Sequence, residues 1–159
     1  MAIYMKWGSV NGGVTTDGFK DWIDLHSFQW GVGRAIGSAT RSSETREGSE
    51  PSISEVVVTK RMDKSSGPLW ADAVGGDLNT KVNIKMTTTT KDKVESFLEY
   101  EFSETGLSGY SVSASGADAP TESLSLNFAK VIWSYTGRDS KIGGSPIKVG
   151  YDLTQMKKV

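Results

Sequence analysis

The chain has 159 residues, which is one domain's length and enough to bury about two-thirds of the unfolded surface, so we predict a single domain over 1–159. With 18 basic and 19 acidic residues the formal net charge is -1, which gives no global attraction to nucleic acid or to an anionic membrane. The absence of cysteine excludes a disulfide framework, a thiolate nucleophile and a cysteine-ligated metal.

Short alternating runs separated by glycine, serine and threonine predict an all-β domain, either a sandwich or a closed barrel. In one run Val82, Ile84 and Met86 alternate with lysine and asparagine, and in the run 98–102 apolar residues alternate with glutamate, so each has one polar face. We expect strands at Ile3–Trp7, Trp22–Trp30, Ile53–Arg61, Lys81–Thr89, Val94–Phe102, Leu107–Ser113, Ser123–Tyr135 and Ile147–Leu153.

One helix is predicted within the segment SSGPLWADAVGG. Ser65 or Ser66 can cap it, Pro68 suits its first turn, and a Gly-Gly pair ends it. Leu69 and Ala73 share one face, so we expect the helix to close one end or side of the barrel.

Two segments are loops by composition. The segment Gly33–Pro51 is rich in glycine, serine and threonine and carries three arginines against three glutamates. A loop of this length inside a compact domain is usually functional or disordered. Ser113–Pro120 is expected to form a shorter surface turn.

No pattern in the sequence favours catalysis, so the protein is not predicted to be an enzyme. His26 is the only histidine and lies two residues from Asp24, but no nucleophile elbow accompanies it. GVGRAIG, at 31–37, lacks both the spacing and the following helix of a dinucleotide loop. Aspartates lack calcium-loop spacing, and lysines beside hydrophobic residues are more often a solvated strand face than a nucleic-acid surface. We therefore expect no cofactor and no metal.

The segment SLSLNFAKVIWSYT, at 123–136, is apolar on both faces of a strand. Leu124, Leu126 and Phe128 lie on one face and Val131, Trp133 and Tyr135 on the other. The helix could cover the second face, a bulge near residues 129 and 130 could return all six side chains to one core, or another copy of the chain could bury them. The pattern by itself leaves the three explanations open.

Four segments resemble one known family in sequence, order and separation. They are HSFQWGVGR, VVVTKRMDKSSGPLW, TESLSLNFAKVIWSYT and GYDLTQ. The most specific part is Val58–Leu69, with the pattern T-K-x-x-D-x-S-x-x-x-L, followed by Glu122–Tyr135, with E-x-x-x-x-x-F-x-x-V-x-W-x-Y. Over essentially its whole length the chain resembles Hcp, the haemolysin-coregulated protein family of bacterial type VI secretion systems.

This resemblance implies a mainly β fold: a small β-barrel of two antiparallel sheets with one short helix, assembling into a closed hexameric ring. Stacked rings form the inner tube of a contractile, phage-tail-like machine that is fired out of the cell. The implied partners are other copies of the chain, the spike protein VgrG, contractile sheath and baseplate proteins, and small secreted effectors carried in the lumen. Ring formation would cover strand faces that a monomer leaves exposed.

The resemblance also assigns roles to particular residues. The loop between the second and third strands, here Gly33–Pro51, would contact the adjacent subunit and the next ring, and its balanced charges suit salt-sensitive stacking. The strand Trp22–Trp30 would face the lumen, where Gln29 is the expected effector contact. The predicted stacking residues are Arg41, Glu44, Arg46 and Glu47, and the predicted subunit interface consists of Val131, Trp133 and Tyr135.

Localisation follows from what the sequence lacks. The N-terminus has no signal-peptide pattern, and no run of about 18 apolar residues occurs, so we predict no membrane insertion and a protein made in the cytoplasm. It would then be secreted without a cleaved signal peptide. Because the last predicted strand lies close to residue 159, we expect no toxin domain appended to it. The alternative function is a monomeric β-barrel that binds a small ligand or carbohydrate.

Overall fold

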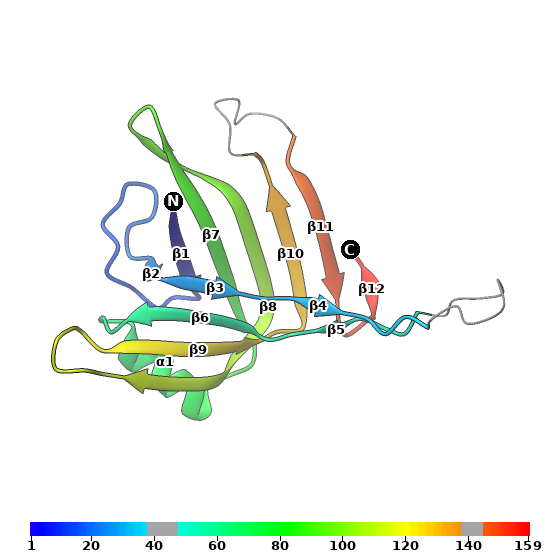
Figure 1. Ribbon diagram of the computed structural model, residues 1–159, viewed down its shortest axis with the longest axis horizontal. Helices are drawn as coiled ribbons and strands as arrows, with labels where there is room; N and C mark the ends of the chain where they lie inside the picture. The colour runs from blue at the N-terminus through cyan, green and yellow to red at the C-terminus, as the bar shows by residue number, and fades with distance from the viewer. Residues whose placement is uncertain (38–47, 138–144) are drawn as a thin grey trace.

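The computed structural model describes residues 1–37, 48–137 and 145–159, which form a mainly β structure with one short helix (Figure 1). The elements in chain order are β1 (Ala2–Trp7), β2 (Ile23–Leu25), β3 (Ser27–Gln29), β4 (Val32–Gly33), β5 (Ser52–Ile53), β6 (Val56–Arg61), α1 (Ser66–Gly75), β7 (Thr80–Thr90), β8 (Lys93–Ser113), β9 (Thr121–Asn127), β10 (Lys130–Tyr135), β11 (Ile147–Asp152) and β12 (Lys157–Lys158).

Two antiparallel sheets share the long strand β8. We call the order β12-β11-β10-β8-β7-β1-β2 sheet A, and the order β3-β6-β9-β8 sheet B. The first part of β8 belongs to sheet A, where Thr105 pairs with Thr80, and the second part belongs to sheet B, where Gly106 pairs with Asn127. In Figure 1 the strands of sheet A run steeply across those of sheet B.

The predicted barrel is two-layered but not closed. Among the described residues β2 and β12 are the free edges of sheet A, and β3 and the second part of β8 are the edges of sheet B. The hydrogen-bonded ladder therefore ends on both sides, and the two layers are joined through β8 and the short β2–β3 connection instead of by a continuous barrel wall.

The predicted strands differ from those of the structure in three main ways. The runs at 94–102 and 107–113 form one 21-residue strand, because β8 exchanges its partner at a bend, where Glu104 has a φ of 50°, and continues beyond it as a strand. Gly106 lies at this bend, and a Cβ there would come within 2.4 Å of Leu78 Cδ2. Conversely, the run at 22–30 divides into β2 and β3 at His26, whose N–H bonds to the Thr59 carbonyl of β6.

The third difference answers the question of the strand with two apolar faces. The segment at 123–135 is two strands, because the chain leaves sheet B after β9 and enters sheet A at β10. The change of phase brings Leu124, Leu126, Phe128 and Val131 into one core, each at most 7% exposed. Trp133 and Tyr135 stay outside it, and Tyr135 is 39% exposed. The break near residue 129 therefore explains four of the six side chains.

The main core fills the space between the two sheets and one side of α1. Strand alternation brings its side chains inward from β1, β2, β7, β8 and β10 of sheet A and from β6 and β9 of sheet B. Its buried members are Met5, Trp7, Ile23, Leu25, Val56, Val58, Leu69, Val82, Ile84, Phe102, Leu107, Leu124, Leu126, Phe128 and Val131.

Helix α1 matches the predicted segment but is not capped as predicted. Ser65 occupies the N-cap position, yet its hydroxyl makes no capping hydrogen bond and instead donates to Asp63. The Ser66 hydroxyl donates to Glu122 at 3.0 Å. A hydrogen bond from a serine hydroxyl to a carboxylate is stronger than one from a backbone N–H group to a serine oxygen. The two serines therefore join a polar cluster and do not cap the helix.

Candidate functional site

An apolar part of sheet A extends beyond the region that sheet B covers. In Figure 1, β10 and β11 rise past β3 and β4. Along β10, Val131 is 2% exposed, whereas Tyr135 on the same face is 39% exposed. The paired residues of β11 behave alike, since Val149 opposite Trp133 is 42% exposed and Ile147 opposite Tyr135 is 62% exposed. We call Trp133, Tyr135, Ile147 and Val149 the sheet A patch.

Aromatic rings connect this patch to the core. Phe28 stacks on Tyr100 with ring centroids 4.8 Å apart, and Tyr100 lies 6.4 Å from Trp133. An open hollow of about 300 Å³ lies beside them. It is lined mainly by apolar side chains, which include Trp30, Trp133 and residues of β5 and β11. Contiguous exposed apolar surface of this kind marks an interaction site more often than a solvated face.

A buried polar cluster fixes α1 against sheet B. Lys60 and Glu122 lie on the core-facing sides of β6 and β9, are both fully buried, and form an ion pair of 2.5 Å. The Lys60 ammonium also bonds to Ser66 Oγ at 3.2 Å and pairs with Asp63 at 3.0 Å. The Tyr110 hydroxyl donates to the other Glu122 oxygen. Buried charges are tolerated only when paired and hydrogen-bonded in this way.

The cluster shifts the pKa of two of its members. Burial raises the pKa of Tyr110 to about 12, and the hydrogen bond to Glu122 and the charge of that residue act in the same direction. Burial alone would raise the pKa of Asp63, but hydrogen bonds from Ser65 and Lys60 and the Lys60 charge outweigh it and lower the pKa. The motif T-K-x-x-D-x-S and the distant Glu122 are thus one structural unit.

The outer face of sheet B is almost entirely polar and largely free of charge. One row of four hydroxyls crosses all four strands, because Ser27 pairs with Thr59, Thr59 with Ser123, and Ser123 with Ser111. Ser27 and Thr59 are hydrogen-bonded at 2.5 Å. Gln29 is exposed on this same outer face, and its side chain points away from that of Phe28.

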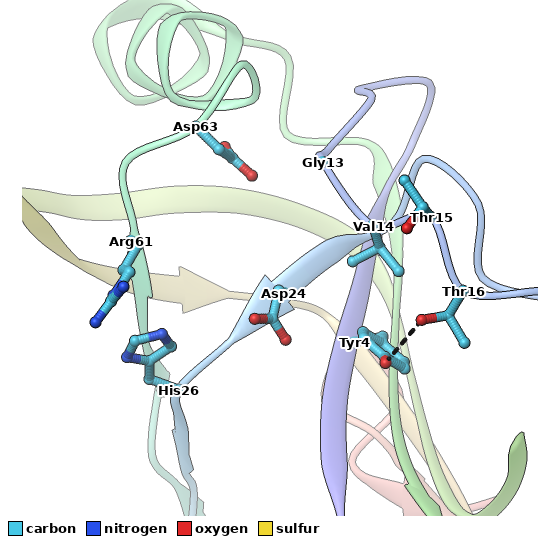
Figure 2. Close-up of a pocket in the computed structure, with 9 residues that line it drawn as sticks. All are labelled: Tyr4, Gly13, Val14, Thr15, Thr16, Asp24, His26, Arg61 and Asp63. Atoms are coloured by element: carbon cyan, nitrogen blue, oxygen red, sulfur yellow. Dashed lines mark hydrogen bonds between the residues drawn. The ribbon is translucent and has the colours of Figure 1, made fainter. Parts of the chain in front are cut away.

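His26 and Asp24 lie in an open polar pocket of about 380 Å³ at one end of the molecule. Figure 2 shows Arg61 close to the His26 ring, Asp24 between them and Tyr4, and Asp63 above. Among the described residues no side-chain hydrogen bond joins His26 to Asp24 or to a hydroxyl, and the Tyr4 hydroxyl is engaged with Thr16 at 3.2 Å (Figure 2). The pocket does not assemble a nucleophile with a general base.

The described residues form neither a metal site nor a membrane-spanning helix. No group of three or more His, Cys, Asp or Glu side chains could hold a metal ion there. In the same part of the chain, no helix is long and apolar enough to span a membrane.

A family model described as type VI secretion system effector, Hcp, matches residues 4–135, well over half of the chain. The chain belongs to the Hcp family. A solved type six secretion system protein is 31% identical to it, with a TM-score of 0.86 and 99% of each chain covered. The comparison with curated proteins gave no match.

Two more distant Hcp-like structures show the fold alone. Hcp1 from Salmonella typhimurium has 20% identity and a TM-score of 0.77, covering 99% of this chain and 98% of that one. A type VI secretion system effector from Yersinia pestis has 16% identity and a TM-score of 0.72, covering 94% of this chain and 98% of that one. Membership of the Hcp family makes this chain a secreted tube and effector protein of a type VI secretion system.

In this Hcp protein the predicted site residues lie in different parts of the fold. Val131 belongs to the core, whereas Trp133 and Tyr135 belong to the sheet A patch. Gln29 lies on the polar outer face of sheet B. The four predicted stacking residues, Arg41, Glu44, Arg46 and Glu47, lie outside the described residues, as does part of the loop 33–51. The described ends of that loop pair with each other through β4 and β5 and through a bridge between Ile36 and Gly48.

Sequence reasoning missed two features of the site. The buried Lys60–Glu122 pair was not recognised. Lys60 lies on the same strand face as Val58, and Glu122 lies on the same face as Leu124, so the alternation places these opposite charges at core-facing positions. The outward side of α1 was also missed. Trp70 is 56% exposed and Val74 is 67% exposed, one helical turn apart on a helix expected to be covered on one side only.

Proposed function

We propose that six copies of this chain close into a ring and that stacked rings form the inner tube of a type VI secretion system. The observation that carries this proposal is the sheet A patch, where Trp133 and Tyr135 continue an apolar face past the edge of the subunit's own second layer. A tube subunit has neighbours that would cover it, and burying one large apolar side chain stabilises by about 1.5–3 kcal/mol.

The whole chain 1–159 acts as one domain in this proposal, and sheet B faces the lumen. Its outer side offers hydroxyls and Gln29, which suit weak polar contacts with small effectors and do not hold them by charge or by an apolar surface. The protein has no enzymatic activity of its own and is present in the cytoplasm before firing. The spike protein VgrG at the tube's tip and the sheath and baseplate proteins are its further partners.

Ring stacking is assigned to the loop 33–51, which extends the β4–β5 pair. In Figure 1 this pair continues the direction of the sheet B strands and leaves the body of the molecule at one end, as an arm that reaches the next ring would. Arg41, Glu44, Arg46 and Glu47 would meet the opposite ring face with little net repulsion.

The test is the mass of the purified protein by light scattering, supported by electron microscopy of the particles. The proposal predicts six times the 17.2 kDa subunit and ring-shaped particles. A stable species of one subunit mass at micromolar concentration would contradict the ring.

A further inference from the structure

Helix α1 is too short and too weakly capped to stay helical by itself. It has 10 residues, whereas an isolated helix in water needs about 12–15 even when its residues favour helix. Two of its residues are glycine, its N-cap side chain makes no capping hydrogen bond, and it has no acidic residue in the first turn and no basic residue in the last. The helix therefore depends on contacts with the rest of the subunit.

Those contacts are few. Among the ten residues of α1 only Ser66 and Leu69 are buried, and Leu69 is the one that enters the main core as a fully buried side chain. Asp72 accepts a hydrogen bond from the Leu107 backbone, but its Oδ2 atom has no partner among the described residues. The backbone hydrogen bonds at both ends of the helix stay within the segment 63–76. The ladders of sheet B are made by strands alone, so they do not depend on α1.

The residue of α1 that joins the buried polar cluster is Ser66. Its hydroxyl donates to Glu122 at 3.0 Å, and it accepts from the Lys60 ammonium at 3.2 Å and from the Asp63 backbone N–H at 3.0 Å. One hydroxyl thus connects the first turn of the helix to β6 and β9. Apolar side chains of similar volume often stabilise a fold as well as a buried ion pair does, so a polar anchor of this kind is a comparatively weak one.

We propose that α1 is a strap that opens as one unit in the free subunit while both sheets stay folded, and that the Ser66 hydroxyl is the latch that sets how often it opens. Segments with few buried apolar contacts open at a lower free energy than the core strands. Opening takes Leu69 out of the core and leaves Trp70 and Val74, which are exposed, without a fixed position. A free subunit therefore presents an ordered helix only while the latch is closed.

Hydrogen exchange of the free subunit, followed by mass spectrometry, tests the strap. The free subunit is Trp133→Glu if the natural protein forms rings, and the natural chain if it does not, so this choice alone rests on the proposed function. We expect the backbone amides at 69–75 to exchange at least about ten-fold faster than those of β7 and β9.

Ser66→Ala tests the latch in the same measurement. It should speed exchange at 69–75 by a further factor of about ten, because it removes hydrogen bonds to two charged groups, and it should leave β7 and β9 unchanged. Alanine favours helix more than serine does, so faster exchange cannot come from helix propensity.

The matched control is Gly67→Ala, at the next position of the helix. Gly67 is exposed, and a Cβ added there meets no atom within 4 Å. Alanine favours the helix and leaves the latch intact, so exchange at 69–75 should slow by about three-fold. The two alanine substitutions are thus expected to act in opposite directions on one segment.

Each outcome decides the inference. Exchange at 69–75 as slow as in β9 would overturn the strap, because the helix would then open only with the sheets. Ser66→Ala that speeds helix and sheets by the same factor would overturn the latch. If Ser66→Ala does not fold, Gly67→Ala decides, since slower exchange confined to α1 supports the strap and unchanged exchange contradicts it. Absence of rings in the natural protein would contradict the proposed function and leave this test as it is.

Discussion

β9 and β10 are separated by two residues in the chain and each has an apolar face, yet the two faces differ in what covers them. Leu124 and Leu126 of β9 are fully buried beneath sheet A of the same subunit. Trp133 and Tyr135 of β10 are covered only in part, since Trp133 lines an open hollow and Tyr135 is 39% exposed. The contrast shows that an apolar strand face predicts burial, but not whether the covering layer comes from the same chain or from a neighbour.

The largest effect on stability is expected at the Lys60–Glu122 pair, which joins β6 to β9. Lys60→Ala removes one partner of a fully buried pair and leaves Glu122 charged in the core, which should lower the free energy of unfolding by about 3–5 kcal/mol. Urea unfolding at fixed protein concentration measures the change, since ring formation couples stability to concentration.

Its control is Lys60→Met with Glu122→Leu, which removes both charges together. This double variant should recover most of the lost stability. Equal destabilisation by the single and double variants would show that the pair is not what fixes β9 and α1.

The Tyr110–Glu122 hydrogen bond makes the stability of the buried polar cluster depend on pH. The folded protein holds the Tyr110 proton to a pKa of about 12, above its value of about 10 in the unfolded chain. The folded state therefore binds more protons in this interval, and its extra stability, complete below about pH 10, is lost as the pH rises toward about 12.

Thermal unfolding of the natural protein and of Tyr110→Phe, compared at about pH 9 and about pH 11.5, measures this loss. The difference between the two proteins should shrink as the pH rises, while other tyrosines and lysines affect both alike. A difference that stays constant with pH would show that folding does not raise the pKa of Tyr110.

A smaller effect per subunit is expected from the charges of the stacking loop 33–51. Reversing Arg41 and Arg46 to Glu should leave rings intact and weaken tube growth and secretion, with raised salt producing a similar effect in the natural protein. Each exposed ion pair contributes less than about 1 kcal/mol, but every contact is repeated around the ring. Long tubes formed by the double reversal, seen by electron microscopy, would assign stacking to other surfaces.

The smallest effect is expected on the outer face of sheet B. Gln29→Arg places a bulky charge beside the hydroxyl row without touching the core or the patch. The ring mass should not change, and the amount of effector that co-purifies should fall. Unchanged co-purification would count against Gln29 as a lumen contact.

The sequence predicts the strands well where one face is polar. The run at 81–89 corresponds to β7, in which Val82 and Ile84 are fully buried and Lys81 is exposed, because alternation directly encodes the two faces. The helix at 66–75 was likewise predicted from its glycine and proline boundaries.

The exchange of sheet partners could not be predicted from this pattern. Alternation says which side a residue faces but not which strand lies beside it, so β8 appeared as two strands and 123–135 as one. The burial of Glu122 was not predicted, because it depends on Lys60, which is 62 residues away in the chain.

The central claim is that Trp133 lies in an interface between copies. Trp133→Glu and Ser134→Glu place the same charge at adjacent positions of β10, on opposite faces of sheet A, and light scattering gives the mass of each variant. The account predicts folded single subunits of 17.2 kDa for Trp133→Glu and six-subunit rings for Ser134→Glu. Intact rings of a folded Trp133→Glu variant would contradict it.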